Sequence, residues 1–251
     1  MIKKEYGRLN VRVLPNRKLM GLEAGKHIES ILLDIIAEKE EARVVFASAP
    51  SQNETLDYLV NDSSVDWSKV VGFHMDEYMG LPRNAPQSFS KFIEDKFLTK
   101  VAFKKWNPML TEGDPDEKIN DYLTLLNEKP IDLVILGIGE NGHLAFIDPP
   151  FCDFNDKEDL KIVTLDEVNR QQQVNDGAFE KIDDVPKTAM TMTIPFLMRV
   201  KHKIAIVPGP TKRNAIKNTL LGPVDPSCPA SILRENDSFL YTDEEGFSYV
   251  D

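Results

Sequence analysis

Four short segments of this sequence gather side chains that can take part in chemistry, and each follows an apolar run. The segments are 48–53, 74–82, 137–150 and 207–212. Between them they supply hydroxyl groups, an adjacent pair of carboxylates, a glycine-rich loop with a histidine, and a lysine. Hydroxyls, a lysine and helix N–H groups bind anions, whereas carboxylates and histidine transfer protons. Together the four segments predict a phosphate pocket beside an acid–base centre.

The pair of carboxylates is Asp76 and Glu77. A carboxylate held near a carbon-bound proton is the usual base in isomerases, so this pair contains a candidate general base. A bare Asp-Glu pair is more often part of a solvated turn. His74, just before the pair, fits a structural role at a strand end as well as it fits a catalytic one. The pair alone does not decide between these interpretations.

The loop from Gly137 to Asp148 contains three glycines within six residues, and glycines permit backbone approaches that other residues cannot make. Their GxGxxG spacing matches a dinucleotide-binding fingerprint only weakly, because the preceding strand is not early in the chain and no helix opens at the last glycine. His143 follows instead, with Asp148 five residues later. This combination suits proton transfer. The alternative is a structural histidine in a turn.

The loop Ser48-Ala49-Pro50-Ser51-Gln52 and the segment around Lys212 both lead into predicted helices. Hydroxyls and N–H groups at a helix N-terminus form an anion site, to which a lysine in the first turn adds positive charge. Each feature has an ordinary alternative: an N-cap serine or asparagine in the first case, and a surface lysine in the second. Their shared position after buried strands favours phosphate binding.

The sequence lacks the motifs of several other chemistries. It has no HExxH motif and no cluster of cysteine and histidine with metal-ligand spacing. The GxSxG nucleophile elbow of many hydrolases is also absent. We therefore predict neither a metal ion nor an organic cofactor.

Apolar runs and helical periodicity alternate along the chain. The expected strands are 43–47, 69–73, 131–136 and 203–207. The expected helices are 22–38, a stretch around 56–59, 88–101, 116–127 and 211–220. This order predicts an α/β fold, a Rossmann-like three-layer domain with a mostly parallel sheet flanked by helices. Ligands of such sheets lie beyond the carboxyl ends of the strands, where the four segments are found.

Length and composition restrict the remaining classes. A chain of 251 residues without an obvious linker is expected to form a single domain spanning 1–251. A net charge of −11 disfavours nucleic acid as a partner. Only two cysteines, far apart, indicate a reducing compartment. Without an apolar leader or a membrane-spanning run, we expect a cytoplasmic protein that has no membrane partner. Homo-oligomerisation stays open.

Two of the segments resemble the glucosamine-6-phosphate deaminase/isomerase family. The matching residues are Met75-Asp76-Glu77-Tyr78-Met79-Gly80-Leu81, then Pro86-Gln87-Ser88-Phe89, and Gly137-Ile138-Gly139-Glu140-Asn141-Gly142-His143-Leu144-Ala145-Phe146. Weaker matches lie at 185–191 and around Lys212. The resemblance implies conversion of a hexosamine 6-phosphate, such as glucosamine 6-phosphate, into a ketose 6-phosphate and ammonia.

Carried over by position, Asp76 is the base that moves a proton between C2 and C1 of the sugar. His143 helps to open the sugar ring, steered by Asp148. Asn141 stands where the family typically has aspartate, and Asp148 where it has glutamate. An arginine that binds substrate in the family has no clear counterpart, and Arg170 is the nearest candidate. The expected substrate- and phosphate-binding residues are Ser48, Ala49, Ser51, Gln52, Gly139, Arg170 and Lys212.

Two other functions are compatible with these segments. The 6-phosphogluconolactonases have a related fold and a similar Gly-x-Asp-Gly-His loop, so a lactone hydrolase is one alternative. A non-catalytic sugar-phosphate-sensing domain is the other, although such regulators carry a basic DNA-binding segment that this chain lacks. The carboxylate at position 76 favours the deaminase, because it serves carbon-acid chemistry.

Overall fold

The computed structural model describes residues 1–250. Its large sheet contains β1 (Ile2–Tyr6), β2 (Leu9–Leu14), β3 (Ala42–Phe46), β4 (Val70–His74), β6 (Lys105–Asn107), β7 (Leu133–Leu136), β10 (His202–Ile206) and β11 (Ser238–Asp243). A small sheet contains β5 (Asp76–Tyr78), β8 (Leu160–Thr164) and β9 (Thr188–Met192). The helices are α1 (Arg17–Lys39), α2 (Asn53–Asn61), α3 (Phe89–Ile93), α4 (Pro115–Asn127), α5 (Glu167–Asn175), α6 (Ile194–Arg199), α7 (Arg213–Leu221) and α8 (Glu244–Phe247).

The large sheet has the strand order β1-β2-β11-β10-β7-β3-β4-β6. Every neighbouring pair in it is parallel except β1 with β2. The small sheet, in the order β5-β9-β8, is antiparallel. The predicted α/β fold with a mostly parallel sheet is therefore confirmed, and the four expected strands correspond to β3, β4, β7 and β10.

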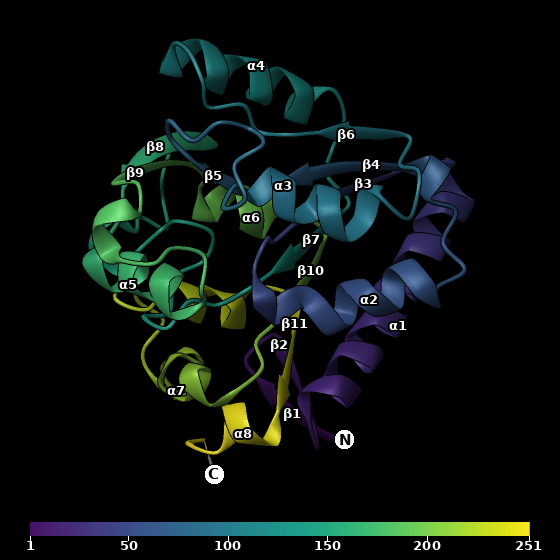
Figure 1. Ribbon diagram of the computed structural model, residues 1–251. Coiled ribbons are helices and arrows are strands. Elements are labelled where there is room, and N and C mark those ends of the chain that lie inside the picture. Colours follow the sequence, from purple (N-terminus) through teal and green to yellow (C-terminus); the bar gives the residue numbers. More distant parts are fainter. Residues whose placement is uncertain (251) are drawn as a thin grey trace.

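The central strands are buried on both faces, which explains their uninterrupted apolar runs. In β3, Val44 and Phe46 join a core cluster that includes α1 and α2, whereas Val45 faces the cluster on the opposite side. That second cluster takes in α6, α7 and the small sheet. Figure 1 shows α1 and α2 side by side, with β5, β8, β9 and α5 gathered in another part of the molecule. Two layers thus enclose the sheet.

Two expectations differ from the observed elements. The helix expected over 88–101 is interrupted, because α3 ends at Ile93 and the chain continues as a π-helical turn, Glu94–Leu98. The strands β1, β2, β6 and β11 and the whole small sheet were not expected. The burial of β1 is low, and its Lys3, Lys4 and Glu5 hide the alternation that would mark a strand.

The order of the central strands creates a crevice. From β3 the chain moves outward to β4 and β6, and then returns to the other side of β3 as β7. The segments that follow β3 and β7 therefore diverge at their carboxyl ends, which is where ligands bind in open α/β sheets. Within residues 1–250, no helix combines the length and apolarity needed to cross a bilayer.

Candidate active site

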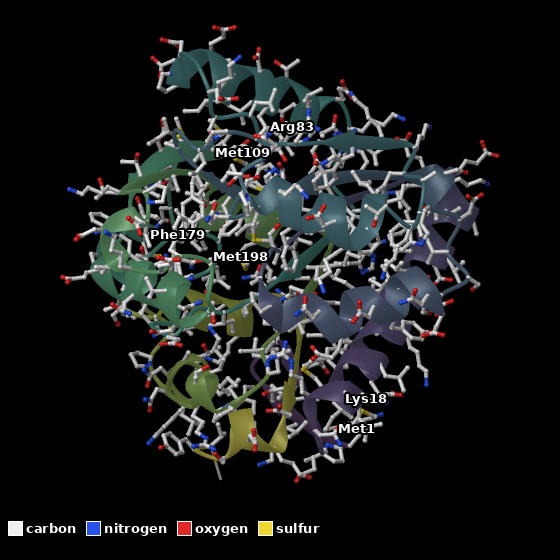
Figure 2. The ribbon with its side chains drawn as sticks, viewed as in Figure 1. Met1, Lys18, Arg83, Met109, Phe179 and Met198 are labelled. Atoms are coloured by element: carbon white, nitrogen blue, oxygen red, sulfur yellow. The ribbon has the colours of Figure 1, made fainter. Side chains whose placement is uncertain are left out.

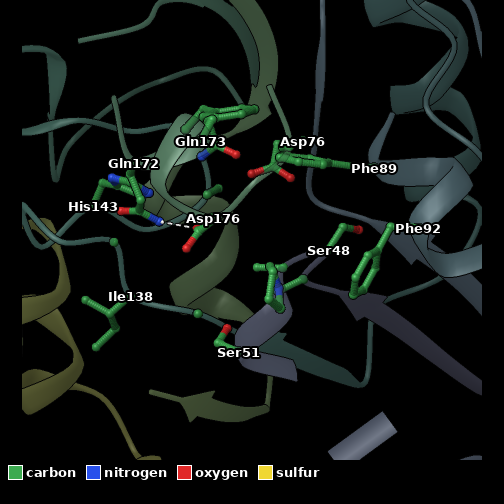
Figure 3. A pocket seen from close by; sticks show the side chains of 18 of the residues that line it. Ser48, Ser51, Asp76, Phe89, Phe92, Ile138, His143, Gln172, Gln173 and Asp176 are labelled. Atoms are coloured by element: carbon green, nitrogen blue, oxygen red, sulfur yellow. Dashed lines mark hydrogen bonds between the residues drawn. The ribbon is translucent and has the colours of Figure 1, made fainter. Parts of the chain in front are cut away.

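A cavity of about 310 Å³ opens at this crevice, and Figure 3 shows several of the side chains around it. It brings together segments that are far apart in the sequence, from the start of α1 to the start of α7. The predicted site residues that line it are Ser48, Ala49, Ser51, Asp76, Gly139, His143 and Lys212. All four chemically interesting segments of the sequence thus meet at one place.

The hydrogen bonds around His143 define which ring nitrogen carries the proton. The Asn141 side-chain N–H donates to Asp148 Oδ1 at 3.1 Å, and an ionised carboxylate can only accept. Asn141 Oδ1 must therefore face His143, where it lies 2.7 Å from Nδ1. An amide oxygen also only accepts, so Nδ1 of a neutral His143 carries the hydrogen. The unprotonated Nε2 of this cavity-lining residue is left to exchange protons with a ligand.

Asp148 stands behind His143 and is fully buried. Its Oδ1 lies 3.2 Å from His143 Nδ1. It also accepts hydrogen bonds from the Asn169 side chain and from the backbone N–H of Asp166. Burial acts to raise the pKa of Asp148, but the hydrogen bonds and the nearby histidine outweigh it and lower that pKa below its usual value. Asp148 is thus held as a carboxylate.

Two positions in this loop require glycine, each for a different structural reason. A Cβ atom on Gly139 would lie 2.0 Å from His143 Cε1, so only glycine lets the ring pack against the loop. Gly142 has a φ of +87°, which favours glycine. Ala145, which lines the cavity, has a φ of 52° although it is not glycine. The loop is therefore shaped around the histidine.

Asp76 and Glu77 have different environments. The Asp76 carboxylate lines the cavity and forms no hydrogen bond with any described residue. Burial, followed by the charge of Glu77, raises its pKa well above the usual value. Glu77 instead accepts hydrogen bonds from Ser88 Oγ and from the backbone N–H groups of Tyr78, Phe89 and Ser90, and so anchors the start of α3.

The opposite side of the cavity is rich in groups that bind anions. Ser48 Oγ is buried and makes no hydrogen bond within residues 1–250. Lys212 is 8% exposed, and its ammonium forms no hydrogen bond in the described chain. Burial lowers the pKa of Lys212, while the charges of Asp176 and Glu140 act to raise it. Ser48 shortly precedes α2 and Lys212 is the N-cap residue of α7, so the N–H groups at the starts of two helices add to the positive potential.

Asn141 and Asp148 lie behind His143 without lining the cavity, and three other sequence candidates, Gln52, Arg170 and His74, do not line it either. Gln52 is fully buried, and its Nε2 donates to Ser51 Oγ at 2.9 Å, so it supports the loop from behind. The guanidinium of Arg170 donates to the carbonyls of Ile182 and Val185, away from the cavity. His74 accepts from the backbone N–H of Met109 at 2.7 Å, and burial lowers its pKa to about 3.

Several lining residues were missed by the sequence reasoning. Gln172, Gln173 and Asp176 reach the cavity from α5 and its C-terminus, and Figure 3 shows them near His143 and Asp76. The polar run 171–176 could have suggested a functional helix face. Arg17 also lines the cavity. Its guanidinium donates to the Pro50 carbonyl and, at 2.7 Å, to Glu54. Both partners are far from Arg17 in the sequence, so no local pattern predicts these contacts.

Comparison with known proteins places this geometry in a family. A family model described as glucosamine-6-phosphate isomerases/6-phosphogluconolactonase matches residues 15–241. A glucosamine-6-phosphate deaminase of Listeria monocytogenes is 35% identical over 214 residues, covering 84% of this chain and 88% of that protein. One from Streptococcus equi subsp. zooepidemicus is 34% identical over 234 residues, covering 92% and 96%.

Solved structures agree with this result. A monomeric glucosamine-6-phosphate deaminase has a TM-score of 0.86 at 26% identity, covering 95% of this chain and 99% of that one. A 6-phosphogluconolactonase from Trypanosoma brucei has a TM-score of 0.79 at 16% identity and covers both chains fully, which is a likeness of fold. The resemblance seen in the sequence motifs is thus confirmed, and the chain belongs to the glucosamine-6-phosphate isomerase/6-phosphogluconolactonase family.

Proposed function

We propose that this protein is an amino-sugar-phosphate deaminase that isomerises its substrate. It converts a hexosamine 6-phosphate, such as glucosamine 6-phosphate, and water into a ketose 6-phosphate and ammonia. The observation that carries the proposal is the Asp76 carboxylate, which lines the cavity without a hydrogen-bond partner in the described chain, on the same cavity as Nε2 of His143.

The phosphate binds at the side of the cavity that holds Ser48, Ala49, Ser51 and Lys212. Ser48 Oγ offers a buried hydroxyl without a partner, and the start of α2 offers backbone N–H groups. Pro50 has no N–H to donate, and the Arg17 guanidinium beside it supplies a compensating positive charge. Binding of this remote group positions the reacting carbons.

His143 opens the sugar ring. Because its Nδ1–H is donated to Asn141, the Nε2 atom accepts the proton of the C1 hydroxyl and returns a proton to the ring oxygen. Asp148 and Asn141 keep the ring nitrogens in these roles. The open chain then exposes the C2 proton.

Asp76 removes the C2 proton and delivers it to C1, while the C1 oxygen gains a proton and the C2 amino group loses one. The double bond thereby moves from C1–O to C2–N and leaves an imine at C2. Water adds to this imine and ammonia departs, giving the ketose phosphate. A raised pKa makes Asp76 a stronger base once it is ionised, which suits removal of a carbon-bound proton. A lactone hydrolase would need His143 to activate water, but it would have no use for a second, unpartnered carboxylate at position 76.

The test is a substrate panel that measures ammonia and ketose phosphate separately. Hexosamine 6-phosphates should yield both products in equal amounts, and unphosphorylated hexosamines should react poorly. Ketose without ammonia would identify a plain isomerase. Hydrolysis of 6-phosphogluconolactone as the only activity would identify the hydrolase.

A further inference from the structure

Asn169 lies between the cavity wall and the carboxylate that supports His143. It belongs to α5 and is fully buried. Its Nδ2 lies 3.0 Å from Asp148 Oδ1 and 3.2 Å from Asp148 Oδ2. Its Oδ1 accepts from Gln173 Nε2 at 3.3 Å. Since the carboxylate can only accept, the orientation of the Asn169 amide is determined.

These bonds form a continuous line from the cavity to the histidine. Gln173 lines the cavity and donates to Asn169, which donates to Asp148, whose Oδ1 faces His143 Nδ1 at 3.2 Å. The backbone supports the same connection, because the N–H of Asp166, next to α5, donates to Asp148 Oδ2 at 3.0 Å. A cavity-facing helix is thus joined to the loop that carries the histidine.

A second tie lies beside the first. The backbone N–H of Glu140 donates to Gln172 Oε1 at 2.8 Å, so α5 holds the histidine loop at two points. Within residues 1–250, the side chains that hydrogen-bond or pair with Asp148 are those of Asn141, His143 and Asn169, and His143 is the titratable one among them. The carboxylate is therefore surrounded mainly by neutral amides.

We propose that Asn169 is a positioning residue, whose amide fixes the Asp148 carboxylate against His143 and transmits the placement of α5 to the histidine. The inference deepens the proposed function and rests on it for kinetic effects alone. Without the amide, Asp148 loses the one donor that is shared by both of its oxygens and keeps one hydrogen bond on each, from the Asn141 side chain and from the Asp166 N–H. The carboxylate is then held less firmly against His143, and the ring is no longer fixed in one orientation.

The experiment compares Asn169→Leu and Asn169→Asp with a matched control in the full chain. Gln171→Ala is the control, since Gln171 is an exposed amide on the same helix that bonds only Asn175 among the described residues. The ¹⁵N signals of the His143 ring, assigned with His143→Gln, report the Nδ1–H form directly. These signals do not depend on any substrate.

In Asn169→Leu the signal of a single Nδ1–H form should be lost, and kcat should fall about 10- to 100-fold with KM within about twofold, as expected for misplaced catalytic groups. In Asn169→Asp, a proton shared with Asp148 restores an O–H donor at low pH. Its kcat relative to wild type should therefore decrease as the pH rises. Gln171→Ala should leave the ring signals, kcat, KM and the pH dependence of kcat unchanged.

Wild-type ring signals in a folded Asn169→Leu protein would overturn the inference. A kcat ratio for Asn169→Asp that stays flat with pH would overturn it as well, because a merely structural role predicts a constant ratio. If Asn169→Leu does not fold, the Asn169→Asp arm decides. If wild type turns over no hexosamine phosphate, the proposed function fails while the ring signals still test Asn169.

Discussion

The support behind His143 and the opposite, anion-binding side of the cavity differ in how their polar groups are satisfied. Asp148 accepts hydrogen bonds on both oxygens from within the protein. Within residues 1–250, neither Ser48 Oγ nor the ammonium of Lys212 forms a hydrogen bond. Buried polar groups without partners are costly in a folded protein. The polar groups of the first region are thus satisfied within the protein, whereas those of the second are left for the phosphate that we propose binds there.

Asp76 extends this comparison to the two carboxylates of the site. The Asp76 carboxylate has no hydrogen-bond partner among the described residues, and its pKa is raised. Asp148 accepts hydrogen bonds on both oxygens, and its pKa is lowered. When their environments shift the pKa values of two carboxyl groups in opposite directions, the two groups are suited to different tasks. In the proposed reaction, Asp76 takes up the carbon-bound proton, and Asp148 keeps a constant charge beside the histidine.

The largest effect should come from Asp76→Asn. The amide keeps the shape of the side chain but cannot accept a carbon-bound proton, so kcat should fall roughly 10²–10⁴-fold. Binding of the product ketose phosphate should stay within a few fold of wild type. Steady-state kinetics and calorimetry measure the two quantities, and a variant that keeps more than about a tenth of kcat would show that Asp76 is not the base.

The next largest effect should come from Lys212→Ala, which sharpens the contrast between the two regions. Loss of a charged hydrogen bond should weaken binding of phosphorylated sugars by about 1.5–3 kcal/mol. Inorganic phosphate should raise the Tm of wild type, because a ligand of the native state stabilises it. The variant should lose most of that rise. Equal weakening for phosphorylated and unphosphorylated sugars would contradict the assignment.

Asn141→Asp tests the hydrogen-bonded support behind His143 by adding a negative charge beside the ring. A new carboxylate there favours the imidazolium, so the acidic limb of the kcat/KM profile should move to higher pH by about one unit. The reason is that neutral His143 is needed in the free enzyme to accept the C1 hydroxyl proton. His143→Gln serves as the control and should lose this limb. A limb that stays in place in a folded variant would mean that residue 141 is not coupled to the histidine.

The smallest effect is expected for Arg17→Gln. The Arg17 side chain is 39% exposed and already paired with Glu54, so its contribution to phosphate binding is screened. We expect KM for the sugar phosphate to rise about two- to fivefold, roughly 0.4–1 kcal/mol, with kcat unchanged. Lys18→Gln, a neighbouring exposed lysine labelled in Figure 2, removes the same charge and should have no such effect. Equal rises in both variants would point to general electrostatics.

The site residues that could be predicted from the sequence each lie within a single loop. Asp76, His143 and the loop 48–51 each follow a buried strand, and parallel strands bring their carboxyl ends to one edge. The partners from α5 could not be predicted in this way, because Asn169 meets Asp148 only after the small antiparallel sheet turns the chain back.

The two arginines show the same limit. Arg170 is the arginine nearest in sequence to the family's substrate-binding position, yet its guanidinium donates to the carbonyls of Ile182 and Val185. Arg17 reaches the cavity from the first turn of α1, more than thirty residues before the loop that it contacts. Contacts of this kind depend on how helices pack, which a single sequence does not encode in a local pattern.

The central pairing of β3 with β7 also has a consequence for folding. It joins Val44 to Leu133, so a long segment that includes β4, β6 and α4 must be accommodated before the two strands meet. Contacts between residues so distant in the chain make folding slow, because their loop-closure entropy is lost before they stabilise anything. The cavity, which needs the ends of both strands, exists only after this step. A sugar phosphate therefore binds the finished chain and slows its unfolding, but it cannot speed the early stages of folding.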